Sequence, residues 1–131
     1  MDLSESTELK AIPFRAFSTN KDEADGDAWK SGTLALKSIV LPKSVEHIEA
    51  LAFWCLYNLE SVTLNEGLEE IWYYAFCGNT RLASINIPST VTYISNAAFT
   101  FGATQPEVKF KTESYSLKDN LILNKAETEL I

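Results

Sequence analysis

The apolar residues of this chain recur every 23 residues, and the recurrence preserves both their position and their type. An alanine followed by a phenylalanine repeats at Ala52-Phe53, Ala75-Phe76 and Ala98-Phe99. Five further apolar positions keep the same interval: Leu36, Leu59 and Leu82; Ile39, Val62, Ile85 and Val108; Leu41, Leu64, Ile87 and Phe110; Val45, Leu68 and Val91; Ile48, Ile71 and Ile94. A repeat of this length predicts a solenoid, whose coils bury a shared core by stacking.

Each repeat has the pattern Leu-x-x-Ile-x-Leu-Pro-x-x-Val-x-x-Ile-x-x-x-Ala-Phe. The alternation in Ile-x-Leu predicts a short strand with one buried face, and stacking places these strands side by side in a parallel sheet. Pro42 and Pro88 end two of the strands, whereas Asn65 takes that place in the middle repeat and Gly67 supplies the freedom to turn. The Ala-Phe step, which has short polar flanks, predicts a single helical turn.

The pattern continues toward the N-terminus across an insertion. Leu9, Ile12, Ala16 and Phe17 align with the apolar residues of the repeat at Val45–Phe53 at an offset of 36, which is one period plus 13 residues. The extra residues lie within 18–35 and include an acidic loop at Asp22–Asp27. This loop lacks the alternating ligand spacing of an EF-hand, so we expect no metal there. The coils are therefore predicted over residues 1–110.

The last part of the chain, residues 111–131, has a different pattern. Two short apolar runs, at Tyr115–Leu117 and Leu121–Leu123, flank Lys118-Asp119-Asn120, which predicts a β-hairpin. Glu129-Leu130-Ile131 could add a third strand to form a meander. This segment is interpreted either as a cap on the solenoid or as an insertion within a longer array.

The net negative charge of the chain disfavours two classes of binding partner. The net charge of −7 and the pI of about 4.7 disfavour nucleic acid and anionic lipid surfaces. No stretch reaches the roughly 18 apolar residues that a membrane span needs. The residues Met1 to Glu5 have neither the basic start nor the apolar run of a secretory signal, so the protein is either intracellular or separated from its leader.

The sequence contains none of the common catalytic or phosphate-binding motifs, so we predict that the chain is not an enzyme and uses no cofactor or metal. Its single histidine, His47, is expected to be a surface residue of its coil. Cys55 and Cys77 lie 22 residues apart, which places them on adjacent coils. Both a disulfide and two free thiols are compatible with that placement.

Two sets of residues are candidates for binding. The strand positions between the buried residues form polar ladders that include Ser61, Thr63, Ser84 and Asn86, and in a solenoid they line an open sheet face. The alternative is a plain solvated face. The second set is aromatic and consists of Trp54, Trp72, Tyr73 and Tyr74. Exposed aromatic rings anchor proteins and the faces of sugars, whereas the alternative role for these rings is packing between coils.

The segments Leu36–Phe53 and Ile85–Phe99 resemble the BspA-like leucine-rich repeat. The resemblance implies an α/β solenoid: a right-handed leucine-rich repeat with 23-residue coils, about four here, built from short parallel strands and single helical turns and ending in a β-hairpin. Glu49, Trp72 and Ser95 depart from the family, which often has glycine at that position. The residues from Tyr115 to Ile131 are similar to a hairpin inserted within such arrays.

The family resemblance also implies a function without catalysis. Such proteins are surface-exposed or secreted in anaerobic bacteria and some protozoa, and several are adhesins that bind host matrix proteins. We therefore expect a protein-binding or adhesion module at a bacterial surface or outside the cell. The alternatives are a glycan-recognition module that uses the aromatic residues, and a structural spacer within a longer repeat array.

Overall fold

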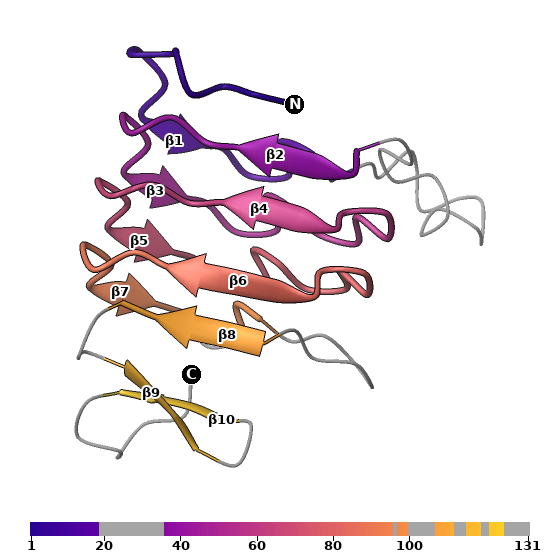
Figure 1. Cartoon of the computed structure of the whole chain (residues 1–131), viewed down its shortest axis with the longest axis vertical. Helices are drawn as coiled ribbons and strands as arrows, with labels where there is room; N and C mark the ends of the chain where they lie inside the picture. Colours follow the sequence, from indigo (N-terminus) through magenta and orange to yellow (C-terminus); the bar gives the residue numbers. More distant parts are fainter. Residues whose placement is uncertain (19–35, 96, 100–106, 112–114, 119–120, 125–131) are drawn as a thin grey trace.

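The computed structural model describes residues 1–18, 36–95, 97–99, 107–111, 115–118 and 121–124. These residues form a stack of coils in which the strands alternate between two sides (Figure 1). On one side, four two-residue strands form one parallel sheet: β1 (Ala11–Ile12), β3 (His47–Ile48), β5 (Glu70–Ile71) and β7 (Tyr93–Ile94). On the other side lie β2 (Ser38–Val40), β4 (Ser61–Thr63), β6 (Ser84–Ile87) and β8 (Glu107–Phe110). The parallel-stranded solenoid predicted from the repeat is therefore present.

The register of the strands follows the sequence period. Ile48 pairs with Ile71, and Ile71 pairs with Ile94, each 23 residues further along the chain. Ile12 pairs with Ile48 across 36 residues, as the predicted alignment around the insertion requires. The acidic loop within that insertion lies outside the described residues.

The sheet of Ile-x-Leu strands is less continuous than expected. β2 pairs with β4 and β6 pairs with β8, but no ladder joins β4 to β6. The sequence pattern did not predict the sheet β1-β3-β5-β7. This sheet is continuous, so it joins the coil of β4 to the coil of β6, where the other side has no ladder.

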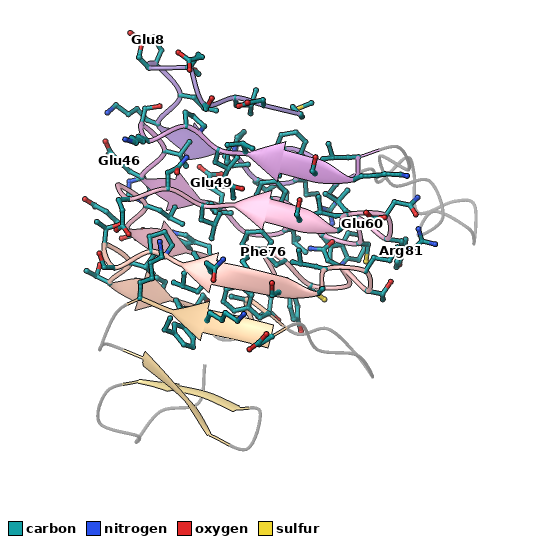
Figure 2. All side chains as sticks on the ribbon, viewed as in Figure 1. Glu8, Glu46, Glu49, Glu60, Phe76 and Arg81 are labelled. Carbon is teal, nitrogen blue, oxygen red and sulfur yellow. The ribbon has the colours of Figure 1, made fainter. Side chains whose placement is uncertain are left out.

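The core follows the predicted apolar positions. Every phenylalanine of the Ala-Phe steps stacks on the next, with ring centroids 5.1 Å apart for Phe17 and Phe53, 5.0 Å for Phe53 and Phe76, and 5.6 Å for Phe76 and Phe99. Figure 2 shows Phe76 inside the stack of coils. The isoleucines of β1, β3, β5 and β7 are also buried. Packing between coils therefore provides the core that one coil lacks.

The single helical turns predicted at the Ala-Phe steps are not confirmed, because the described residues contain no helix. The residue before each Ala-Phe pair has a positive φ: 55° at Arg15, 60° at Leu51, 53° at Tyr74 and 60° at Ala97. Hydrogen-bonded turns flank this position, such as the bond from the Ala52 N–H to the Glu49 carbonyl. A left-handed residue in each coil interrupts any right-handed helix, so the chain forms consecutive turns.

The predicted hairpin is present, as β9 (Tyr115–Lys118) and β10 (Leu121–Asn124) pair in antiparallel orientation. Its turn residues, and the third strand expected at residues 129–131, lie outside the described part of the chain. The division into coils over residues 1–110 and a terminal segment over residues 111–131 stays a prediction.

One buried polar residue links two coils. The side chain of Asn79, which is 1% exposed, accepts a hydrogen bond from the Leu56 N–H at 2.9 Å and donates one to the Phe76 carbonyl at 2.9 Å. Asn79 thus provides hydrogen-bond partners for backbone groups in its own coil and in the preceding one. A buried backbone group without a partner would lower the stability of the fold.

We expect Asn79→Leu to lower the free energy of unfolding by roughly 2–4 kcal/mol, because two buried backbone groups lose their partner. The measurement is urea unfolding followed by circular dichroism. Asn86→Leu is the matched control, since Asn86 is exposed on β6. Equal losses in the two variants would show that the buried bonds of Asn79 do not stabilise the fold.

Candidate binding surface

The polar residues predicted on the sheet face lie on neighbouring strands. Ser61 and Thr63 are on β4, while Ser84 and Asn86 are on β6. Three of the four are exposed, and Ser84 is partly buried. No hydrogen bond involves their side chains within the described residues, so their polar groups are free to contact solvent or a ligand. They form a polar surface without an aromatic anchor among them.

The predicted aromatic residues do not form one platform. Trp72 packs edge-on against Tyr93 with ring centroids 5.8 Å apart, and the ring centroids of Tyr73 and Tyr74 are 3.9 Å apart. Trp54 interacts with the thiol of Cys77 instead. Trp72 and Tyr73 are each 45% exposed, whereas Trp54 and Tyr74 are partly buried. Trp72 is therefore the member of the predicted set that offers an exposed ring beside a second exposed ring.

Trp72 borders an open hollow of about 460 Å³ on the outer side of the sheet β1-β3-β5-β7. The residues that line the hollow come from three successive coils: Phe14, His47, Glu49, Ala50, Glu70 and Trp72. His47 and Glu70 face outward because they precede the buried isoleucines of β3 and β5, and side chains alternate along a strand. Of these six residues, Trp72 alone was predicted from the sequence as a candidate for binding, and its role there stays a prediction.

The two carboxylates of the hollow are held in place by neighbouring donors. The Phe14 N–H donates to Glu49 Oε2 at 2.7 Å, and the Trp72 indole N–H donates to Glu70 Oε2 at 2.9 Å. His47 Nδ1 lies 3.3 Å from the same oxygen of Glu70 but makes no hydrogen bond and is shielded from solvent. Within the described residues, neither carboxylate is paired with a lysine or an arginine.

Lys10 and Arg15, the two basic residues of the first coil, do not line the hollow. Lys10 forms an ion pair with Glu46 at 2.8 Å. The hydrogen bond between them raises the pKa of Lys10 and lowers the pKa of Glu46. The guanidinium of Arg15 lies 5.2 Å from the centre of the Phe14 ring, but Arg15 does not line the hollow. The hollow thus combines two exposed aromatic rings with two carboxylates, neither of which pairs with a lysine or an arginine in the part of the chain that the structure describes.

The two cysteines lie on adjacent coils, as predicted, and both are free thiols. The Cys55 N–H donates to the Cys77 carbonyl at 2.8 Å. Burial raises the pKa of each thiol, and burial with a hydrogen bond to Cys55 raises the pKa of Tyr57 to about 12. A thiol with a raised pKa is a poor nucleophile at neutral pH, so this pair has the character of core residues.

The described part of the chain contains no group of three or more histidine, cysteine or acidic residues able to hold a metal ion. Over the same residues, no helix has the length and apolar character that crossing a membrane requires.

The chain is a repeat protein with an extended surface. Its coils stack as a solenoid, have parallel strands on two sides, and contain a recurring buried phenylalanine. Residues 27–129 match the BspA type leucine rich repeat region, in 6 copies. The chain therefore belongs to the BspA-type leucine-rich repeat family. No curated protein and no solved structure matches the chain. Repeats of this class generally mediate protein–protein interaction, are typically non-enzymatic, and in this family are commonly surface-exposed or secreted.

Proposed function

We propose that this chain is a non-enzymatic module that binds a protein partner, and that it serves adhesion at a bacterial surface or outside the cell. The observation that carries the proposal is the hollow between Phe14 and Trp72, which are 55% and 45% exposed. Large exposed aromatic rings beside polar groups are the residues that most often anchor protein interfaces. Family membership supports binding as the general role and surface adhesion as its setting.

Glycan recognition is the second candidate, because exposed aromatic rings also stack on sugars. Trp72 and Tyr93, each 45% exposed, favour it. Their planes meet at 61°, however, so they offer one ring face and one edge rather than a flat platform. The carboxylates beside Trp72 favour a partner with basic groups over a neutral sugar.

The proposed function is tested by measuring binding of the purified chain to immobilised extracellular matrix proteins and to a glycan panel, at two salt concentrations. We expect saturable binding to a protein, and we expect Trp72→Ala to weaken it by about tenfold or more, the usual effect of losing an interface anchor.

Asn86→Ala is the control variant, because Asn86 lies on β6, in the other sheet. Loss of binding in Asn86→Ala with unchanged binding in Trp72→Ala would move recognition to the face of β4 and β6. Binding to a glycan alone, lost in Trp72→Ala, would establish the second candidate in place of the first.

A further inference from the structure

We propose that the hollow binds the guanidinium group of an arginine side chain presented by the protein partner. This inference rests on the proposed function and specifies the chemistry of the partner. Glu49 and Glu70 would hold the charge, and Phe14 and Trp72 would contact its planar faces. Nothing in the repeat pattern requires these four side chains for the core, since the buried positions of these coils are other residues.

The carboxylates of the hollow favour a cationic ligand. Within the described residues, Glu49 accepts one hydrogen bond, from the Phe14 N–H, and Glu70 accepts one, from the Trp72 indole N–H. A carboxylate accepts several more. Those two donors fix the carboxylates without neutralising them, because neither donor is charged. The basic side chain in the lining is His47, whose Nδ1 lies 3.3 Å from Glu70 Oε2 without a hydrogen bond to it. The chain as a whole has a net charge of −7, so the long-range field also favours a basic partner.

The aromatic rings of the hollow also favour a cationic ligand. A cation within about 6 Å of a ring centroid is attracted to the ring face, and indole is the best such ring. Phe14 already has the Arg15 guanidinium 5.2 Å from its centre, which shows that a guanidinium can lie at this ring. Because Arg15 is not among the residues that line the hollow, it leaves the space itself open.

Arginine fits this arrangement better than lysine does. The guanidinium is planar, stacks on aromatic rings, and has five donors that can reach two carboxylates at once. An ammonium group has a compact, strongly held hydration shell and would gain less from the rings. The volume of about 460 Å³ lies within the usual range of small-molecule sites and admits a long side chain with its water.

The experiment uses the whole chain labelled with ¹⁵N and three capped peptides, acetyl-Gly-X-Gly-amide, in which X is arginine, lysine or citrulline. The indole N–H signal of Trp72, assigned by its loss in Trp72→Phe, reports occupancy of the hollow. We expect a saturable shift of this signal with the arginine peptide. Binding should be about tenfold weaker for citrulline, which has nearly the same shape without the charge, because a charged hydrogen bond is lost.

Charge-neutral variants test the carboxylates. Glu49→Gln and Glu70→Gln keep an acceptor for the Phe14 N–H and the Trp72 indole but remove the charge, and each should weaken the arginine peptide by about tenfold. Glu60→Gln is the matched control, because it removes the same charge beside β4, apart from Glu49 (Figure 2). Unchanged unfolding midpoints in all three variants would confirm that only binding is compared.

The outcomes separate this inference from the proposed function. Equal binding of the arginine and lysine peptides would overturn the guanidinium assignment, and equal binding of citrulline would overturn the role of charge. No shift with any peptide, together with protein binding that depends on Trp72, would reject the inference and retain the proposed function. A specific arginine shift without any protein partner would retain the inference and reject the proposed function.

Discussion

Replacing Phe76 by alanine is expected to lower the free energy of unfolding by about 3–5 kcal/mol, the usual cost of deleting a buried phenylalanine ring. Phe76 is fully buried, and its ring stacks on Phe53 at 5.0 Å on one side and on Phe99 at 5.6 Å on the other. In a solenoid each coil is stabilised mainly by its neighbours, so a cavity at this position weakens two interfaces between coils.

The measurement is equilibrium unfolding in urea, followed by circular dichroism. Phe14→Ala is the control, because it removes the same ring from a position that is 55% exposed, and surface substitutions usually change stability by less than about 0.5 kcal/mol. If Phe76→Ala fails to fold, Phe76→Leu provides a smaller cavity and should retain a measurable transition. Similar stabilities of Phe76→Ala and Phe14→Ala would contradict the stacked core.

The core could be predicted from the sequence because burial repeats with the coil. Positions such as Ile48 and Ile71 are apolar in every repeat, and the structure buries them in matched register. The same argument predicted the Ile-x-Leu strands and the adjacency of Cys55 to Cys77. Prediction from the repeat period succeeds for these features because every coil must present the same apolar surface to its neighbour.

The second sheet could not be predicted in this way. Its strands are two residues long, as in His47–Ile48, and alternation cannot be recognised over so short a stretch. The turns at the Ala-Phe steps were also missed, because leucine and tyrosine give no sign of the positive φ at Leu51 and Tyr74. Left-handed backbone is usually recognised from glycine or asparagine.

The hollow escaped prediction because its residues are distant in the sequence. Phe14, His47 and Trp72 belong to three coils, and only the stacking of β1, β3 and β5 brings them together. Two signals were present nonetheless. Glu49 and Trp72 occupy a position where the resembling repeats often have glycine, and the residue before each buried isoleucine must face outward.

Gly67 marks the place where the repeat deviates from its own pattern, and Gly67→Ala is expected to cost roughly 2–6 kcal/mol of unfolding free energy. Its φ of +123° is a conformation that residues with a Cβ rarely adopt. An added Cβ would stand 2.4 Å from the carbonyl oxygen of Lys43, a backbone atom of the preceding coil that cannot rotate away. The substitution therefore combines backbone strain with a clash between coils.

Gly78→Ala is the comparison, measured by the same urea unfolding. Its φ of +79° is also left-handed, but the atom nearest to the added Cβ is the Cys55 Sγ at 2.7 Å, a side-chain atom that can move. We therefore expect Gly78→Ala to be the milder of the two changes, and Gly67→Ala to be the more destabilising. The Gly67 N–H donates to Thr90 Oγ1 at 3.1 Å, so the glycine also links its coil to the next. If Gly67→Ala were as stable as the unmodified chain, the turn at 65–67 would have to adopt another conformation, because the present one has no room for a methyl group against Lys43.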